Sequence, residues 1–207
     1  MSDLILYTNP MSRGRIARWA LEEVGARYEV RVMNYADTMK GDDYLAINPM
    51  GKVPAIAHNG KVITECAAIC AYLGDAFPDA GLAPALADRA DYYRWLFFAA
   101  GPVEAAVTNN TAGFVPSADQ RRTFGYGSYD QAIDVLEQAV SARDYVAGDA
   151  FTMADVYVGS QVIWGTQFGS IPKRDAFAAY AERLTSRDAC KRASELDDAL
   201  METNQLA

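Results

Sequence analysis

The residues that could carry chemistry at the start of the chain are a tyrosine, a serine and two arginines. They lie in LYTNPMSRGR, residues 6–15, between a short apolar strand that ends at Tyr7 and a helix that starts near Ser12. The backbone N–H groups at a helix start are unpaired and, together with the helix dipole, attract anions. A hydroxyl there can donate a hydrogen bond to a thiolate and so lower the pKa of a thiol from about 8.5 towards neutral.

A second feature is NPMGKVPAI, residues 48–56, in which Val53-Pro54 stands at the mouth of a strand. Proline cannot donate to a strand ladder, so this position is a sheet edge or a turn. If the Val53-Pro54 bond is cis, the N–H and C=O of Val53 can face a ligand backbone in antiparallel fashion. The alternative is an ordinary tight turn.

A third feature is ITEC, residues 63–66, at the switch from a strand to a helix. Glu65 can accept a hydrogen bond from an ammonium group while the helix start holds a carboxylate, so a ligand with both charges, such as an α-amino acid, fits. The alternative is that Glu65 only favours the first turn of its helix. Cys66 and Cys70 have a helix-face spacing rather than the C-x-x-C of a redox pair, and we expect both thiols to be buried and inert.

The elements that position these features follow from the apolar periodicity. The first 77 residues predict the order β-α-β followed by β-β-α, with a hairpin at His58-Asn59-Gly60. Residues 34–46 read as a polar loop that can hold a helical turn. The expected strands are 4–7, 28–32, 53–57 and 61–64, and the expected helices run from about 12 to 25 and from 65 to 77.

Two prolines and a glycine in PDAGLAPALA, residues 78–87, indicate a linker. The rest of the chain reads as helices, and the first of them can bend at Gly101-Pro102. Thr152 and Asp155 form a capping box ahead of a helix that is apolar nearly all round, so this helix should be central. The other expected helices are 88–107, one that Ser117 and Gln120 cap, one that begins at Pro172, and one over 187–200.

The composition argues against several classes of protein. The chain has 207 residues, 22% of them charged, and a net charge of −8, so we expect no nucleic-acid partner. No apolar stretch reaches the roughly 18 residues of a membrane span, and the N-terminus has no basic region or long apolar core, so we expect a cytoplasmic protein. A single histidine, His58, and three sparse cysteines argue against a metal site and a disulfide framework.

These motifs together resemble the cytosolic glutathione S-transferase family over roughly residues 3–200. The resemblance is carried by N-P-x-G-K-V-P-A before a hairpin, an acidic residue that starts the next helix, and G-x-x-F-T-x-A-D in an all-helical second half. It implies an α/β plus all-α fold class. A thioredoxin-like domain over 1–78 is expected to bind glutathione as co-substrate, and a helical-bundle domain over 88–207 is expected to supply most of the electrophile pocket. The resemblance also implies a homodimer.

The resemblance assigns roles in holding glutathione. Val53 is expected to pair with the cysteinyl backbone beside a cis Pro54, and Glu65 is expected to meet the γ-glutamyl ammonium. Cys66 stands where the family usually has a serine, whose hydroxyl and N–H hold the γ-glutamyl carboxylate. A thiol is a much weaker donor, which puts the affinity for glutathione in question. The capping pair Thr152 and Asp155 is expected to be structural.

Two residues compete to activate the glutathione thiol. Tyr7 lies twelve residues before Trp19, as in tyrosine-type members, and Ser12 lies five residues after Tyr7, as in serine- and cysteine-type members. The stretch NPMSRGR is more similar to bacterial serine-type sequences, which favours Ser12. The other readings are packing for Tyr7, a helix N-cap for Ser12, and activation by backbone groups or Asn9.

Glutathione is a net anion, so a local cation is expected at the site. The candidates are Arg13, Arg15 and Lys52, and Lys52 could reach the glycyl carboxylate. For the pocket of the electrophile we expect Met11 from the first domain and Phe98, Pro102, Trp164 and Phe168 from the second.

The function expected from these residues is to lower the pKa of the glutathione thiol and to direct the thiolate at a small apolar electrophile. Conjugation, peroxide reduction, dehalogenation and isomerisation all use this thiolate and stay open. The alternative is a non-catalytic protein of the same fold that binds apolar ligands or a partner protein. A thiol-disulfide reductase is disfavoured because no cysteine stands at the first helix start.

Overall fold

The computed structural model describes residues 3–205, without the side chains of 203–205. The chain forms two compact units. The first contains the chain up to Leu82 and again from Ser186 onward, and the second spans Ala83–Thr185. The division after Leu82 falls inside the stretch expected to be a linker. The end of the chain, which was expected to belong with the helical domain, groups with the first unit instead.

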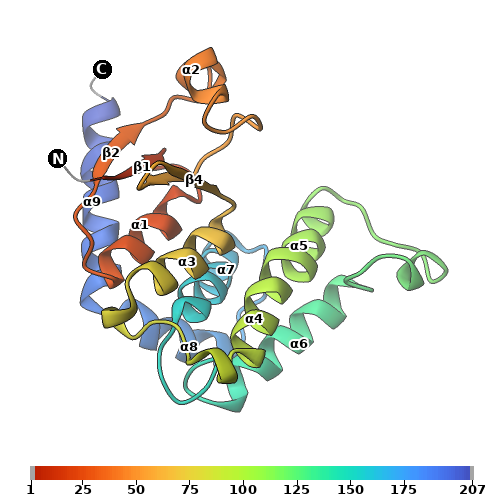
Figure 1. Cartoon of the computed structure of the whole chain (residues 1–207). Coiled ribbons are helices and arrows are strands. Elements are labelled where there is room, and N and C mark those ends of the chain that lie inside the picture. Colours follow the sequence, from red (N-terminus) through yellow and green to blue (C-terminus); the bar gives the residue numbers. More distant parts are fainter. Residues whose placement is uncertain (1–2, 206–207) are drawn as a thin grey trace. The chain divides into compact units, whose positions relative to one another are not determined.

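The first unit is built on a four-stranded sheet (Figure 1). Its strands are β1 (Leu4–Thr8), β2 (Glu29–Val32), β3 (Ala55–His58) and β4 (Lys61–Thr64), in the spatial order β2-β1-β3-β4. β1 runs parallel to β2 and antiparallel to β3, and Leu6 pairs with Val30 on one side and with Ile56 on the other. β3 and β4 form the predicted hairpin, in which Asn59 and Gly60 both have positive φ.

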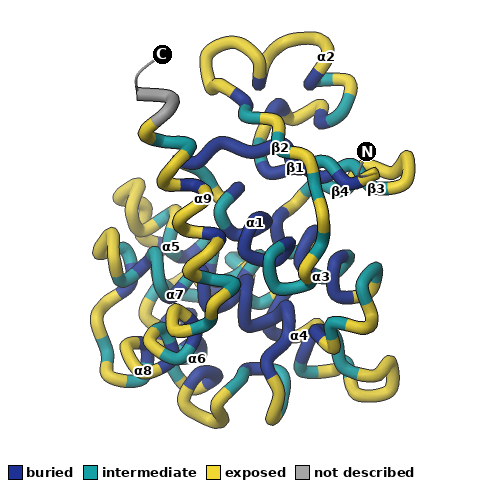
Figure 2. The backbone as a smooth tube through the Cα atoms, turned by 90° about the vertical axis from the view of Figure 1, so that its left-hand side faces the viewer, coloured by how far each residue is buried: buried dark blue, intermediate teal, exposed yellow. Residues whose placement is uncertain are grey.

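The two faces of the sheet are covered differently. Because side chains alternate along a strand, Leu4 and Leu6 share one face, where α1 (Gly14–Glu23) and α3 (Cys66–Ala76) pack on the strands. Tyr7 lies on the other face, in a hydrophobic cluster with Met39 and Tyr44. These two residues come from η1 (Thr38–Lys40) and α2 (Asp42–Leu45), the short helical turns in the polar loop. Helix α1 is mostly buried, whereas the α2 segment is largely exposed (Figure 2).

The last helix, α9 (Asp188–Gln205), packs along α1 and so belongs to the first unit. The buried pair between Arg18 Nε and Asp197 Oδ1, at 2.8 Å, lies at the centre of this contact. Burial raises the pKa of the Asp197 carboxyl, and the Arg18 guanidinium counteracts that rise. Ion pairs join α9, with the residue before it, to α1 at Arg15–Asp198, Arg18–Asp197, Glu22–Arg192 and Glu23–Arg187.

The second unit is helical. α7 (Met153–Phe168) is buried on most of its surface, as its apolar sequence predicts. The predicted capping box forms: Thr152 Oγ1 accepts from the N–H of Ala154 at 3.2 Å, and Asp155 Oδ2 accepts from the N–H of Thr152 at 2.9 Å. Oδ1 of Asp155 accepts from the Tyr180 hydroxyl at 2.8 Å. The other helices are α4 (Ala90–Phe98), α5 (Glu104–Thr111), α6 (Tyr129–Ala142) and α8 (Asp175–Thr185).

Three helix boundaries differ from the predicted ones. The predicted helix 88–107 is α4 and α5 joined by a π-helical turn, Ala99–Val103, that contains Pro102. Ser117 and Gln120 exchange hydrogen bonds of 2.8 and 3.4 Å, but only a single turn, η5 (Gln120–Arg122), follows them. Gly127, with φ 66°, interrupts that segment, and α6 starts after it with Ser128 as its cap. The helix expected from Pro172 begins at Asp175.

Within the described residues, no helix is both long and apolar enough to cross a membrane. The same residues hold no cluster of three or more His, Cys, Asp or Glu side chains that could bind a metal ion.

Candidate active site

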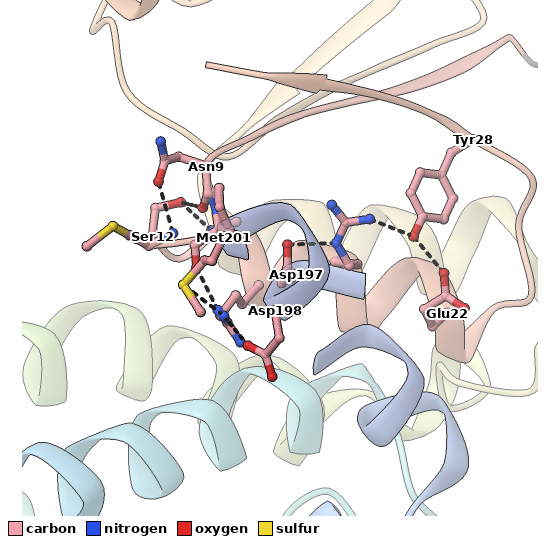
Figure 3. Close-up of polar contacts among 12 residues, drawn as sticks. Asn9, Ser12, Glu22, Tyr28, Asp197, Asp198 and Met201 are labelled. Carbon is pink, nitrogen blue, oxygen red and sulfur yellow. Dashed lines mark hydrogen bonds and ion pairs between the residues drawn. The ribbon is translucent and has the colours of Figure 1, made fainter. Parts of the chain in front are cut away.

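The loop between β1 and α1 is anchored by Asn9, which is almost fully buried. Asn9 Nδ2 donates to the carbonyl of Met33 at 2.8 Å, and Oδ1 accepts from the N–H of Met11 at 2.9 Å. Met33 directly follows β2, so the side chain of Asn9 ties the loop to the neighbouring strand. Figure 3 shows Asn9 and Ser12 together at the start of α1.

The Ser12 hydroxyl is part of this loop and lies at the N-terminal end of α1. Its Oγ donates to the carbonyl of Asn9 at 2.6 Å and accepts from the N–H of Gly14 at 2.9 Å. Ser12 is only partly buried. The cap position itself is taken by Arg13, without a side-chain capping bond, so Ser12 precedes the predicted position by one residue. The hydroxyl is therefore held in place, and one surface of the residue is open to solvent.

Gly14 makes the close packing of this helix start possible. A Cβ at this position would collide with Thr8 Oγ1 and would lie 3.0 Å from Ser12 Oγ. A side chain at residue 14 would thus displace either the end of β1 or the Ser12 hydroxyl.

Tyr7, the other candidate for thiol activation, is packed in the core of its unit. Its side chain is 6% exposed, and its ring centroid lies 5.6 Å from that of Tyr44. The guanidinium of Arg31 lies over the same ring at 5.9 Å. Of the two predicted hydroxyls, Ser12 is thus the one that lies at the helix start.

The loop 48–52 is fixed through its backbone carbonyls. The Tyr44 hydroxyl and Asn48 Nδ2 both donate to the carbonyl of Lys52, at 2.6 and 2.8 Å. Lys40 Nζ donates to the carbonyl of Gly51 at 2.7 Å. Burial raises the pKa of Tyr44 to about 12, so its hydroxyl remains a donor at neutral pH. The side chain of Lys52 is exposed.

The Val53-Pro54 peptide bond, which follows this loop, is cis. Pro54 is buried and Val53 is partly buried. Neither the N–H nor the C=O of Val53 is hydrogen-bonded to another group within residues 3–205. The residue thus presents a free donor and a free acceptor just before β3, which is the arrangement the sequence predicts for a cis bond.

Glu65 has an unusual backbone conformation at the start of α3. Its φ is 62° and its ψ is 116°, a region that residues with a side chain rarely adopt. Its carboxylate is exposed and does not cap the helix. The first intrahelical bond runs from the N–H of Ile69 to the carbonyl of Glu65, at 2.9 Å, so the N–H groups of residues 66–68 have no intrahelical partner.

Cys66 connects the two helix starts. The residue is 8% exposed, and its Sγ donates to the carbonyl of Arg13 at 3.6 Å. This contact joins Arg13, the residue after Ser12 at the start of α1, to the residue that follows Glu65 at the start of α3. A hydrogen bond with Cys66, together with burial, raises the pKa of the Cys70 thiol well above its usual value.

The cationic candidates have different surroundings. Arg13 and Lys52 have exposed side chains. Arg15 is already engaged: its Nε donates to the carbonyl of Pro10 and its Nη2 pairs with Asp198, both at 2.6 Å. Arg15 is therefore a structural group of the loop rather than a cation available to a ligand.

The predicted pocket residues are distributed over both units. Met11, in the first unit, is 76% exposed, and its carbonyl accepts from the Tyr35 hydroxyl at 3.2 Å. In the second unit, Phe98 and Pro102 lie at and after the end of α4, and Trp164 and Phe168 lie on the last turns of α7. Phe168 is 75% exposed and the other three are partly buried. These residues remain a predicted pocket.

Sequence reasoning missed the residues that hold the site in shape. Tyr44 and Asn48 fix the loop before Val53, but both come from a polar stretch without periodicity. Arg15 pairs with Asp198, a residue 183 positions away, and no local pattern signals that contact. Asn9 before a proline is a turn signal, which could have indicated its anchoring role.

The first unit is a thioredoxin-like domain, as its sheet order and the cis proline before β3 indicate. The two helix starts that meet at Cys66 and Arg13 suit a peptide that carries an α-amino-acid group. Residues 2–75 match the family model described as Glutathione S-transferase, N-terminal domain. Glutathione S-transferase 3 of Zea mays is 31% identical over 173 residues, which cover 75% of this chain and 75% of that protein.

Solved structures of glutathione transferases are also similar to this chain. A sphingomonad glutathione S-transferase complexed with glutathione matches with a TM-score of 0.76 and 30% identity, over 94% of this chain and 98% of that chain. A glutathione transferase from Methylococcus capsulatus matches with a TM-score of 0.77 and 26% identity, over 95% and 99% of the two chains. The chain belongs to the glutathione S-transferase family. The predicted family, fold class and class of enzyme, a glutathione transferase, are confirmed.

Proposed function

We propose that this chain activates the thiol of glutathione with the Ser12 hydroxyl and directs the thiolate at a small apolar electrophile. The observation that carries the proposal is the meeting of two helix starts through the Cys66–Arg13 contact of 3.6 Å. That contact joins Arg13, the residue after Ser12, to Cys66, the residue after Glu65, so a partly exposed hydroxyl and an exposed carboxylate flank it in the sequence. A hydroxyl, unpaired N–H groups and a carboxylate at one place match a ligand that carries a thiol, a carboxylate and an ammonium group.

In this proposal glutathione binds through three backbone or carboxylate groups. Val53 offers its free N–H and C=O to the cysteinyl backbone. Glu65 accepts from the γ-glutamyl ammonium, and the unpaired N–H groups at the start of α3 receive the γ-glutamyl carboxylate. The strained backbone of Glu65 supports a binding role, because such conformations persist where the surrounding structure enforces them and often occur at ligand sites.

Cys66 contributes its backbone rather than its thiol. Since the thiol donates to the Arg13 carbonyl, and thiols are weak donors, we infer that the γ-glutamyl carboxylate relies on the Cys66 N–H and the helix dipole. Arg13 and Lys52, both exposed, are the cations proposed for the negative charge of glutathione, with Lys52 at the glycyl carboxylate.

The proposed activation turns the Ser12 hydroxyl from one acceptor to another. In the free protein the hydroxyl donates to the Asn9 carbonyl. When a thiolate is bound, the O–H donates to its sulfur instead, while the Gly14 N–H still donates to Oγ and makes the O–H a stronger donor. The hydrogen bond and the dipole of α1 both favour the thiolate, so the pKa of the bound thiol falls.

The chemical step then needs no covalent intermediate with the protein. The thiol proton goes to water, and the thiolate sulfur forms a bond to the electrophilic carbon. In a displacement, the leaving group departs with the electron pair of the bond that breaks. In a conjugate addition, the carbanion formed takes a proton from solvent. Met11, Phe98, Pro102, Trp164 and Phe168 are the apolar side chains we propose for the electrophile. A homodimer in the cytoplasm is the assembly and compartment we propose.

The test measures glutathione binding by calorimetry and turnover with an activated aryl halide, an enone and an organic hydroperoxide. The proposal expects binding in the parent and in Ser12→Ala, turnover with at least one electrophile in the parent, and a large loss of turnover in Ser12→Ala. Glu65→Ala should weaken binding itself. Binding without turnover of any electrophile would instead favour the non-catalytic binding protein. In that case the Ser12 hydroxyl would keep donating to the Asn9 carbonyl, at 2.6 Å, when glutathione is bound.

A further inference from the structure

Arg15, on the first turn of α1, links the C-terminal helix to the loop that holds Ser12. Arg15 Nε donates to the carbonyl of Pro10 at 2.6 Å, and Nη2 contacts Asp198 Oδ1 at 2.6 Å and Met201 Sδ at 3.5 Å. Asp198 and Met201 both belong to α9. Figure 3 shows Asp198 and Met201 with the dashed contacts that reach them from α1.

Pro10 lies inside the loop whose geometry sets the Ser12 hydroxyl. The residue before it, Asn9, offers the carbonyl that accepts from Ser12, and the residue after it, Met11, donates to Asn9 Oδ1. The carbonyl of Pro10 therefore sits between the two halves of this hydrogen-bond network. A guanidinium held on that carbonyl restricts the Pro10–Met11 peptide plane, whose N–H donates to Asn9 Oδ1, and this plane adjoins the Asn9 carbonyl that accepts from Ser12.

The direction of the Arg15 guanidinium depends in turn on Asp198. The side chains of Arg15 and Asp198 are 23% and 57% exposed, and a pair so open to solvent contributes little to stability on its own. Its effect is geometric. The planar guanidinium of Arg15 donates through Nε to Pro10 in the loop and through Nη2 to Asp198 on α9. Two acceptors on different elements fix the orientation of this plane.

A second α1–α9 pair, Glu22–Arg192, lies near the opposite end of α1. Arg192 Nε donates to Glu22 Oε2 at 2.6 Å, and the Arg192 side chain is 50% exposed. Glu22 lies seven residues after Arg15 on α1. This pair docks α9 in the same way without any contact to residues 9–13, and it therefore provides a matched control.

We propose that Asp198 is a positioning residue for the Ser12 hydroxyl and acts through Arg15 and the Pro10 carbonyl. Asp198 itself does not touch glutathione. The inference rests on the proposed function, because it assigns a role in the activation of the thiol by Ser12. It makes the last helix of the chain a determinant of the pKa of the bound thiol.

The test compares Asp198→Ala with the control Arg192→Ala and with Asp198→Asn, which keeps an oxygen acceptor for Arg15. One readout is the ultraviolet absorbance of bound glutathione thiolate as a function of pH. The other is hydrogen exchange of the amides in residues 9–14. We expect Asp198→Ala to raise the apparent thiol pKa, to lower kcat/KM at neutral pH about tenfold and to speed exchange in the loop. Arg192→Ala should stay within about twofold of the parent, and Asp198→Asn should lie between.

If Asp198→Ala and Arg192→Ala behave alike in both readouts, Asp198 only docks α9 and the inference is wrong. If the parent does not shift the thiol pKa at all, the proposed function fails, and loop exchange alone then decides the inference. Faster exchange confined to the Asp198 variants would support the positioning contact, and equal exchange in both alanine variants would overturn it.

Discussion

The Cys66 thiol donates a hydrogen bond to the carbonyl of Arg13 across 3.6 Å, and this contact closes the start of α3 against the start of α1. Two positive helix ends therefore meet at a small surface, with Ser12 on one side and Glu65 on the other. Neither helix start alone would select a ligand, because unpaired N–H groups bind many anions. In the proposed function, their combination with the Ser12 hydroxyl and the Glu65 carboxylate selects a ligand with a thiol and an amino-acid end.

Cys66→Ser tests whether the thiol limits the affinity for glutathione. A hydroxyl is a stronger donor than a thiol and can reach either the Arg13 carbonyl or a bound carboxylate. We expect the Kd of glutathione to fall about fivefold, which corresponds to about 1 kcal/mol for one added hydrogen bond, as measured by calorimetry. Cys70→Ser, one turn further into α3, is the control and should leave the affinity unchanged. An unaltered or higher Kd in Cys66→Ser would show that the carboxylate is held without this side chain.

Glu65→Gly separates backbone strain from ligand binding. Glycine adopts positive φ more readily than other residues, so the variant should unfold at the same temperature as the parent or higher, with a gain of up to about 1 kcal/mol. Glutathione should bind more weakly because the carboxylate is gone. Thermal unfolding and calorimetry measure the two effects. The control Ala71→Gly, in the middle of α3, should lose about 1 kcal/mol of stability. If Glu65→Gly loses as much stability as this control, the backbone of Glu65 is not strained in the parent.

The partly buried thiol of Cys190 should resist alkylation. Burial, and then the nearby Glu23 carboxylate, raise the pKa of Cys190 to about 11. Since the thiolate is the reactive form, Cys190 should react with iodoacetamide at pH 7.5 about 300-fold more slowly than a free cysteine of pKa about 8.5. Its rate should rise about tenfold per pH unit up to pH 10. Mass spectrometry of labelled peptides measures the rates, with protein in guanidinium chloride as the control. A rate near that of the unfolded chain would contradict the burial.

Much of the first unit was predictable because its signals are local. Asn59-Gly60 between two apolar runs specifies a hairpin, and a tight turn or sheet edge at Val53-Pro54 follows from proline lacking an N–H. In the second unit, α7 (Met153–Phe168) follows from the capping box that starts at Thr152 and from an apolar sequence. The fold class came from combining these local signals in one order along the chain.

The rest depended on contacts that no local pattern encodes. The last helix belongs to the first unit because Arg15, Arg18, Glu22 and Glu23 of α1 have charge partners near the end of the sequence. Ser117 and Gln120 do form their hydrogen bonds, yet the glycines that follow stop the helix after one turn. Ser12 lies one residue before the cap, at a helix start where Gly14 has no room for a Cβ beside Thr8.

The most direct test of the central proposal is the ultraviolet titration of glutathione thiolate bound to the parent, to Ser12→Ala and to Tyr7→Phe. The proposal predicts a thiol pKa well below that of free glutathione in the parent and in Tyr7→Phe, and a pKa that returns towards the free value in Ser12→Ala. Tyr7→Phe also serves as the control for a lost hydroxyl in the same unit. A shifted pKa that survives in Ser12→Ala, or that is lost only in Tyr7→Phe, would contradict the assignment of Ser12.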